Sequence, residues 1–222
     1  MDVRESPMML ARALGLYEPA KVQALRKFLK PGATFIDIGA NKGDFTVLAA
    51  SIVGPSGRVI AIEPGQNNFN WLRRSVEENA IANAECHRIA LGSDNYKGVL
   101  HLATMSGLHS LLSLPGRVEV GVELVDVRAL DHFIGDAGVD AIKIDVEGFE
   151  AEVLVGADRT LGKASLTSIF LDIHPDLGVD SAVMRTLAGY GFGLHEPTPP
   201  YRSIVPAGDV TEVVALRGGR SW

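Results

Sequence analysis

The stretch Ala33-Thr34-Phe35-Ile36-Asp37-Ile38-Gly39-Ala40-Asn41-Lys42-Gly43 decides how this chain folds. Its apolar, β-forming first half ends at Ile38 and small residues follow at once, which predicts a buried strand and a tight turn. Helical spacing begins just beyond the turn, at Phe45, Leu48, Ala49 and Ile52. Such a turn lets the backbone approach a ligand, whose groups meet amides at the helix N-terminus. The glycine spacing differs from the dinucleotide-binding pattern, because Asn41 stands where the middle glycine would be.

Outward from this stretch, short apolar runs alternate with segments of helical periodicity. We expect strands over residues 33–38, 58–62, 85–91, 140–145, 166–173, 192–195 and 211–216, and helices over 19–29, 149–161 and 181–188, with a further helix marked by Phe69, Leu72 and Val76. Strands that alternate with helices in this way form a parallel sheet covered on both faces. The sequence therefore predicts a doubly wound, mostly parallel α/β sheet with an antiparallel terminal strand.

Residues 95–127 break this rhythm, because apolar residues recur there at alternate positions. The residues concerned are Leu100 and Leu102, then Val118, Val120, Val122 and Leu124. A period of two predicts strands, and a Gly/Ser-rich loop over 104–117 separates them. We interpret the segment as an inserted, hairpin-like antiparallel element at the edge of the main sheet. The chain 1–222 is thus predicted as one domain, with an N-terminal helical segment over 1–30 and an α/β core over 31–217.

Composition and charge exclude several classes of protein. Hydrophobic residues make up 46% of the chain and charged residues 22%, as in ordinary globular domains. The net charge is −6 and no Lys/Arg run occurs, so nucleic acid is not an expected partner. No apolar run approaches the ~20 residues that span a bilayer, and the N-terminus lacks a continuous apolar leader. Cys86 is the only cysteine, which fits a reducing compartment, and we expect a cytoplasmic protein.

Glu63 ends the second predicted strand, beside the turn that follows the first. The carboxyl ends of neighbouring parallel strands lie at the same edge of a sheet, and an acid in this position can accept hydrogen bonds from both hydroxyls of a ribose. The two strand ends together predict a nucleoside-binding site. Without the turn beside it, Glu63 would be interpreted as a solvated carboxylate before Pro64.

Several motifs occur in a fixed order along the chain. They are Asp37-Ile38-Gly39-Ala40-Asn41-Lys42-Gly43, Glu63-Pro64, Ser110-Leu111, Leu130-Asp131 and Lys143-Ile144-Asp145-Val146-Glu147-Gly148, the last continuing through Glu150, Val153, Leu154 and Gly156. Over residues 33–175 this order resembles the FkbM family of class I methyltransferases, and the segment from Lys143 to Gly148 is its most specific part. The resemblance implies a Rossmann-like methyltransferase sheet, S-adenosylmethionine as the cofactor, and methylation of a hydroxyl on a sugar, glycolipid or polyketide-like metabolite.

The resemblance also implies where the cofactor lies. Its methionine end would lie over the turn 39–43, its ribose on Glu63, and its adenine near residues 90 and 91. The implied cofactor-binding residues are Asp37, Gly39, Ala40, Asn41, Gly43, Glu63, Ala90, Leu91 and Asp145. This chain departs from the family in having Gly65-Gln66 where an Asn-Pro pair is frequent, and Asp172 where many members have Glu.

Charged residues also gather at the ends of the strands expected over 140–145 and 166–173. Lys143, Asp145 and Glu147 share one face by strand periodicity, as do Asp172 and His174. A hydroxyl is a poor nucleophile, so a general base or a metal assists methyl transfer. The candidate catalytic residues are His174, Glu147 and Asp145, and the candidate ligands of a divalent cation such as Mg²⁺ are Asp145 and Asp172. We expect Lys143 to neutralise the acids, and a purely structural His174 is the alternative.

Two other functions fit part of the sequence. A nicotinamide-dependent oxidoreductase also uses a glycine turn and a strand-end acid, but Asn41 and the terminal strands argue against it. A non-catalytic module would bind a nucleoside only, and the acids of the second half argue against that. His109 stands apart from the other histidines because it lies in the long loop of the insertion. A small-molecule acceptor is the expected partner, and the sequence leaves homo-oligomer formation open.

Overall fold

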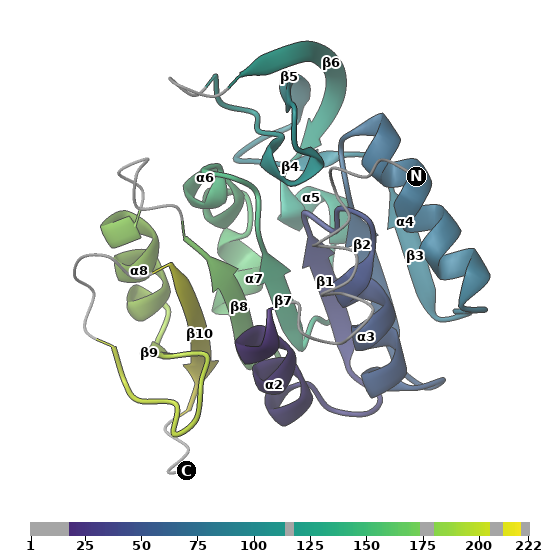
Figure 1. Cartoon of the computed structure of the whole chain (residues 1–222). Helices are drawn as coiled ribbons and strands as arrows, with labels where there is room; N and C mark the ends of the chain where they lie inside the picture. The colour runs from purple at the N-terminus through teal and green to yellow at the C-terminus, as the bar shows by residue number, and fades with distance from the viewer. Residues whose placement is uncertain (1–17, 114–117, 174–179, 205–210, 219–222) are drawn as a thin grey trace.

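The computed structural model describes residues 18–113, 118–173, 180–204 and 211–218, and a seven-stranded sheet forms its centre (Figure 1). Its strand order is β3-β2-β1-β7-β8-β10-β9, with β1 (Thr34–Ile38), β2 (Arg58–Ile62), β3 (Ala84–His87), β7 (Ala141–Ile144), β8 (Ser168–Asp172), β9 (Phe192–His195) and β10 (Glu212–Arg217). Five neighbouring strands run parallel, namely β3, β2, β1, β7 and β8. In contrast, β10 runs antiparallel to both β8 and β9. The predicted mostly parallel α/β sheet is therefore confirmed, and its antiparallel strand lies between two others.

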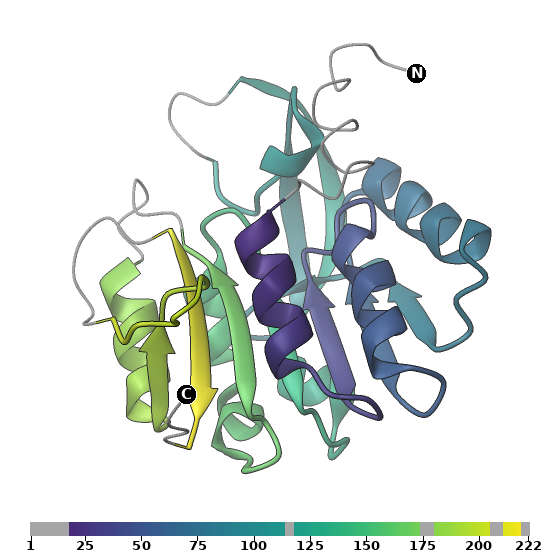
Figure 2. The same ribbon diagram turned by 60° about the horizontal axis from the view of Figure 1, so that its bottom comes forward.

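Helices cover both faces of this sheet (Figures 1 and 2). One face carries α2 (Pro19–Phe28), α3 (Asp44–Val53) and α4 (Gln66–Glu78), and the other carries α5 (Leu130–Ile134), α6 (Glu150–Val155), α7 (Asp158–Gly162) and α8 (Asp180–Gly189). Phe35 packs with Phe45 of α3, while Ile36 and Ile38 pack with Val153 of α6 on the opposite side. Both faces of β1 are buried, which explains its nearly continuous apolar sequence. Among the helices in the described ranges, none is long and apolar enough to cross a bilayer.

The insertion forms a separate sheet, not an extension of the main one. β4 (Ala90–Leu91), β5 (Tyr96–Ala103) and β6 (Glu119–Arg128) pair in the order β4-β6-β5, and a short 3₁₀ helix, η2 (Ser106–Leu108), follows β5. β5 and β6 are antiparallel, as expected. The expectation that they lie at the edge of the main sheet is wrong. The small sheet lies beyond the carboxyl ends of β1, β2 and β7 (Figures 1 and 2). It does not extend the main sheet, because its strands pair with one another and bury their own apolar cluster.

Two predicted elements are split in the structure. The strand expected over 85–91 ends at His87, because only β3 pairs with β2, and Ala90–Leu91 pairs with β6 of the small sheet. The helix expected over 149–161 breaks into α6 and α7 at Gly156. A Cβ on Gly156 would lie 2.0 Å from the carbonyl oxygen of Gly92, so two backbone segments meet at this glycine. Both interruptions depend on partners distant in the sequence.

The first turn of α7 has a separate cap. The carboxylate of Asp131, from α5, accepts the backbone N–H groups of Arg159 at 2.7 Å and Thr160 at 3.0 Å. It also accepts the hydroxyl of Thr160 at 2.6 Å. An acid that satisfies the free N–H groups of a helix stabilises that end. The conspicuous Leu130-Asp131 pair therefore has a structural function in this chain.

Candidate active site

The turn after β1 passes so close to the end of β7 that only glycine fits at its first position. Gly39 has a φ of +75°, and a Cβ there would lie 1.8 Å from the carbonyl oxygen of Asp145. The N–H groups of Gly39 and Ala40 both donate to the carbonyl of Ile62, at 3.0 and 2.9 Å. Gly43, at a φ of +94°, lies against Leu72 of α4 and starts α3. The turn is thus fixed to β2 and α4 before any ligand binds.

Glu63 follows β2 at the same edge, and its carboxylate is buried. Oε2 accepts the N–H of Asn41 at 2.9 Å, and Oε1 accepts the N–H of Gly65 at 2.9 Å. Burial raises the pKa of Glu63 to about 7, although these hydrogen bonds favour the charged form. The side chain of Asn68 is a third hydrogen-bond donor to this carboxylate, and a carboxylate has about four acceptor positions in all. The side chain is therefore oriented by the protein and remains able to bind hydroxyl groups.

A cavity of about 590 Å³, including its solvent-open mouth, lies at this edge of the sheet. Its floor is formed by the ends of β1 and β2 and the segment after β7, and its cover is the small sheet with the loop after η2. The lining residues are Ile38, Gly39, Asn41, Ile62, Glu63, Pro64, Asn68, Ala90, Leu91, Leu100, Gly107, His109, Ser110, Leu111, Asp145, Val146, Glu147 and Phe149. Concave sites whose lining combines apolar side chains with a few converging polar groups are typical small-molecule sites.

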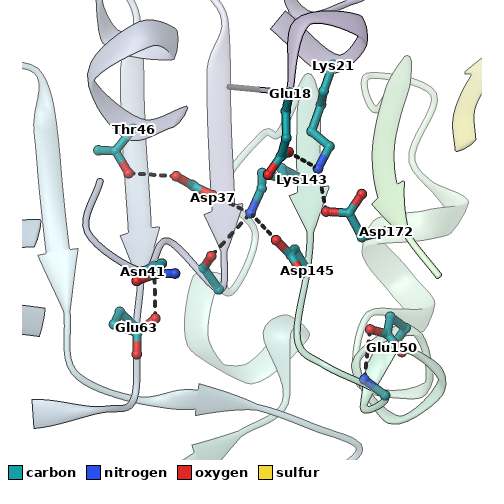
Figure 3. A network of polar contacts seen from close by, with 12 residues as sticks. Glu18, Lys21, Asp37, Asn41, Thr46, Glu63, Lys143, Asp145, Glu150 and Asp172 are labelled. Carbon is teal, nitrogen blue, oxygen red and sulfur yellow. Dashed lines mark hydrogen bonds and ion pairs between the residues drawn. The ribbon is translucent and has the colours of Figure 1, made fainter. Parts of the chain in front are cut away.

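A buried network of charges lies beside the cavity (Figure 3). The Nζ of Lys143 lies 3.4 Å from Oδ1 of Asp37 and 3.6 Å from Oδ2 of Asp145, and it donates to the carbonyl of Gly39 at 3.2 Å. Burial would lower the pKa of Lys143, but the carboxylates around it, Asp37 first, outweigh that effect and raise it. The expectation that Lys143 neutralises its acidic neighbours agrees with this geometry.

The network continues to α2 through a second buried lysine. Lys21 pairs with Glu18 of the preceding turn and with Asp172 at the end of β8. Burial, and then the nearby Asp145, raise the pKa of Asp172 to about 8, against the lowering effect of Lys21 and Lys143. Two ammonium groups thus lie among the carboxylates that were candidate metal ligands. Within the described ranges, no cluster of three or more His, Cys, Asp or Glu side chains could hold a metal ion.

Asp145 and Glu147 reach the cavity by a turn and not by strand periodicity. β7 ends at Ile144, and Glu147 and Gly148 have positive φ values of 54° and 100°. The hydroxyl of Ser110 donates to the carbonyl of Glu147 at 2.8 Å and joins this turn to the loop of the insertion. The expectation that the two acids share a strand face is therefore wrong. They nevertheless line one cavity.

The structure separates the sequence-predicted residues into groups. The cavity is lined by Gly39, Asn41, Glu63, Ala90, Leu91, Asp145 and Glu147, whereas Asp37, Ala40 and Gly43 are not among its lining residues. Asp37 is fully buried and accepts the hydroxyl of Thr46 at 2.6 Å, so it holds α3 and Lys143 in place. Ala40 is 5% exposed and packs in the apolar cluster of α4. His174 lies outside the described residues.

Several residues that line the cavity could not be predicted from the sequence. Asn68, in the first turn of α4, and Phe149, just before α6, carry no motif that marks them. Leu100, Gly107 and His109 come from the insertion, whose place over the cavity depends on long-range packing. The Ser110-Leu111 pair was a usable signal, since both of its residues line the cavity.

Comparisons with known proteins agree with this architecture. Residues 37–194 match the model of the "Methyltransferase FkbM domain" family. Methyltransferase 1 of Beauveria bassiana is 27% identical over 150 residues, which cover 58% of this chain and 60% of that protein. The probable cobalt-precorrin-6B C(15)-methyltransferase (decarboxylating) of Sulfolobus acidocaldarius is 38% identical over 144 residues, 62% of this chain and 73% of that protein.

A solved structure, methyltransferase FkbM from Methylobacillus flagellatus KT, superposes with a TM-score of 0.57 at 18% identity, over 96% of this chain and 59% of that one. This chain thus spans about three fifths of the Beauveria and Methylobacillus proteins. The likeness to the solved structure concerns the fold, and the family match covers the turn after β1, Glu63 and the segment from Lys143 to Gly148. The chain belongs to the FkbM methyltransferase family.

Proposed function

We propose that this protein transfers a methyl group from S-adenosylmethionine to a hydroxyl of a small molecule such as a sugar, glycolipid or polyketide-like metabolite. The observation that carries the proposal is the buried, doubly anchored carboxylate of Glu63, which faces a cavity at the switch point of the sheet. The acceptor class comes from the family alone. The acidic chain argues against nucleic acid, and the single cysteine supports a cytoplasmic location.

The residues around the cavity fit this cofactor. Glu63 can accept both ribose hydroxyls, and Ala90, Leu91 and Leu100 supply an apolar surface for adenine. Asp145 lies at the opposite end, next to Gly39, where its carboxylate can bind an ammonium group. When bound, the cofactor supplies an activated methyl group on a sulfonium. The nicotinamide alternative lacks this support, because the cavity has Asn41 where a dinucleotide fold needs glycine.

We assign different roles to the two acidic residues after β7. Asp145 lines the cavity with its carboxylate 3.6 Å from Nζ of Lys143, and we assign it to binding the methionine end of the cofactor. Glu147 lines the same cavity on the side of the insertion, and it is the carboxylate that we assign to orienting or deprotonating the acceptor hydroxyl. His174 remains a second candidate base on sequence grounds. Since lysines compensate Asp145 and Asp172, we expect turnover to survive chelation of divalent cations.

Calorimetry with S-adenosylhomocysteine tests the proposal. Glu63→Ala should weaken binding by about 5- to 150-fold, as expected when a charged hydrogen-bonding partner is lost. Glu85→Ala is the matched control, because Glu85 pairs with Arg58 on an exposed strand surface away from the cavity. Binding of NAD in preference to the sulfur compound would overturn the proposal. Transfer of labelled methyl groups to carbon, as the name of the Sulfolobus relative implies for that protein, would overturn the acceptor atom only.

A further inference from the structure

The loop after η2 places one histidine at the roof of the cavity. His109 is half-buried and lines the cavity together with Gly107, Ser110 and Leu111. The loop is joined to the small sheet by two backbone hydrogen bonds between His101 and Ser110, at 2.8 and 3.2 Å. It is also joined to the turn after β7 through the hydroxyl of Ser110. The loop that carries His109 is therefore hydrogen-bonded both to the small sheet and to the turn after β7.

The backbone determines which nitrogen of His109 carries the proton. The N–H of Ala103, at the end of β5, donates to Nδ1 of His109 at 3.0 Å. Burial lowers the pKa of His109, against the raising effect of Glu123 and Glu147, so the ring is neutral at physiological pH. In a neutral imidazole whose Nδ1 accepts a hydrogen bond, the proton lies on Nε2. The free edge of the ring is thus a hydrogen-bond donor.

The ring edge formed by Nε2 and Cδ2 and the carboxylate of Glu63 both lie next to Gly65. Nε2 and Cδ2 form the side of the ring opposite Nδ1, and Cδ2 lies 3.4 Å from the point where a Cβ on Gly65 would be. Oε1 of Glu63 lies 3.1 Å from the same point. A donor and a carboxylate acceptor therefore converge on one region of the cavity wall. A hydroxyl placed there can donate its proton to Glu63 and accept a hydrogen bond from His109 at the same time.

We propose that His109 is a nucleoside-recognition residue, whose Nε2–H donates to a ribose hydroxyl that Glu63 binds and whose Nδ1 is fixed by the amide of Ala103. The inference rests on the proposed function, since it takes the cavity to bind a ribose. It assigns to the insertion a direct part in choosing a ribonucleoside over a deoxyribonucleoside. It also gives the loop after β5 a direct contact with the ligand, in addition to that of Leu100.

Nitrogen-15 NMR of histidine-labelled protein tests the first half of the proposal without any turnover. The signal of His109 is identified by its loss in His109→Asn. At pH 7.5 we expect the neutral tautomer protonated on Nε2, and a shift of that nitrogen when S-adenosylhomocysteine is added. A ring protonated on Nδ1, or one whose Nε2 does not respond to the ligand, would overturn the assignment.

Two substitutions separate the two ring nitrogens. His109→Asn keeps an acceptor near the place of Nδ1 and removes the Nε2 donor, so its affinity for S-adenosylhomocysteine should fall about tenfold. His109→Gln keeps a donor near the place of Nε2 and should lose less affinity. Against the deoxyribose analogue that lacks the shared hydroxyl, His109→Asn and the wild type should bind equally. His132→Asn is the matched control, because Nδ1 of His132 is also hydrogen-bonded, to Asn95 at 3.0 Å, but outside the cavity.

The outcomes distinguish this inference from the proposed function. If the wild type binds S-adenosylhomocysteine and His109→Asn binds it equally well, the role of His109 is wrong and the proposed function stands. If the wild type and Glu63→Ala both fail to bind it, the proposed function and the inference fall together. Circular dichroism and the melting temperature of each variant establish that a loss of affinity is not a loss of fold.

Discussion

Glu63 should make cofactor affinity depend on pH near neutrality. Its pKa is raised to about 7 by burial, and ribose hydroxyls bind the ionised carboxylate better than the acid. Binding therefore releases a proton, and the affinity for S-adenosylhomocysteine should rise as the pH increases from 6 and level off above about 7.5. Calorimetry in two buffers of different ionisation enthalpy measures the released proton. Glu63→Gln should bind more weakly and without this proton release, and an equal release in that variant would place the titrating group elsewhere.

Glu147 should affect turnover more than cofactor binding. If its carboxylate orients or deprotonates the acceptor, Glu147→Gln lowers kcat by roughly 10²–10⁴-fold. Its affinity for S-adenosylhomocysteine should stay within about twofold, since the amide keeps the size of the side chain. Asp145→Asn should reduce both quantities, because Asp145 is assigned to the cofactor. Transfer of a labelled methyl group measures kcat, and calorimetry on the same preparations measures the affinity for S-adenosylhomocysteine. Full turnover in Glu147→Gln would mean that positioning by other groups drives the transfer.

The contact between Lys21 of α2 and Asp172 of β8 should affect how the stability of the protein depends on pH. Lys21→Met removes the ammonium that faces Asp172, whose pKa is already raised to about 8. The pKa of Asp172 then rises further, so at pH 9 the folded variant either keeps a proton that the unfolded chain has lost or buries an unpaired carboxylate, and both cost stability. We expect a loss of about 3 kcal/mol there and a smaller loss at pH 6, where Asp172 stays protonated. Urea denaturation at the two pH values measures this difference.

The double variant provides the control for this element. In Lys21→Met/Asp172→Asn neither charge remains, so most of the stability lost at pH 9 should return. Asp172→Asn alone leaves Lys21 with Glu18 and the more distant Asp145, and we expect a smaller loss. If the double variant is as unstable as Lys21→Met, then apolar packing, and not the ion pair, holds α2 against β8.

Elements that depend on neighbours in sequence were predictable, and those that depend on distant partners were not. β1 and β2 follow from apolar runs that end in turns, and the nucleoside site was expected because Gly39 and Glu63 each directly follow such a run. The end of β3 at His87 and the helix break at Gly156 depend on β6 and on Gly92. Lys21 and Asp172 are 151 residues apart, so no local pattern could indicate their contact. The same holds for His109, whose place over the cavity follows from the packing of the insertion.

At the scale of the whole molecule, the two sheets should differ in stability. The insertion buries a small cluster of Ala90, Leu100, Val125 and Val127, and the outer face of β6 is exposed, with Val122 at 56% and Leu124 at 75%. The main sheet is buried on both faces. Amides of β5 and β6 should therefore exchange hydrogen through lower-energy openings than those of β1 and β7.

Ligand binding should narrow this difference, because the cavity wall contains residues from both sheets. Saturation with S-adenosylhomocysteine should slow exchange in β5 and β6 more than in α8, which contributes no residue to the wall among the described ones. Hydrogen-exchange mass spectrometry with and without the ligand gives the comparison. If the ligand protected α8 and the insertion equally, it would stabilise the whole fold, and this would contradict a local effect of the ligand on the two sheets that it contacts.

The placement of β10 determines when the main sheet can be completed during synthesis. β9 precedes β10 in the chain, yet within the described strands its ladder partner is β10 alone. Until residues 212–217 leave the ribosome, β8 has an open edge and β9 has no strand to join. An open edge of buried apolar residues such as Ile169 and Leu171 is a template for pairing with other chains. Copies whose translation stops before β10 are therefore expected to be held by chaperones or degraded, so that only finished copies accumulate.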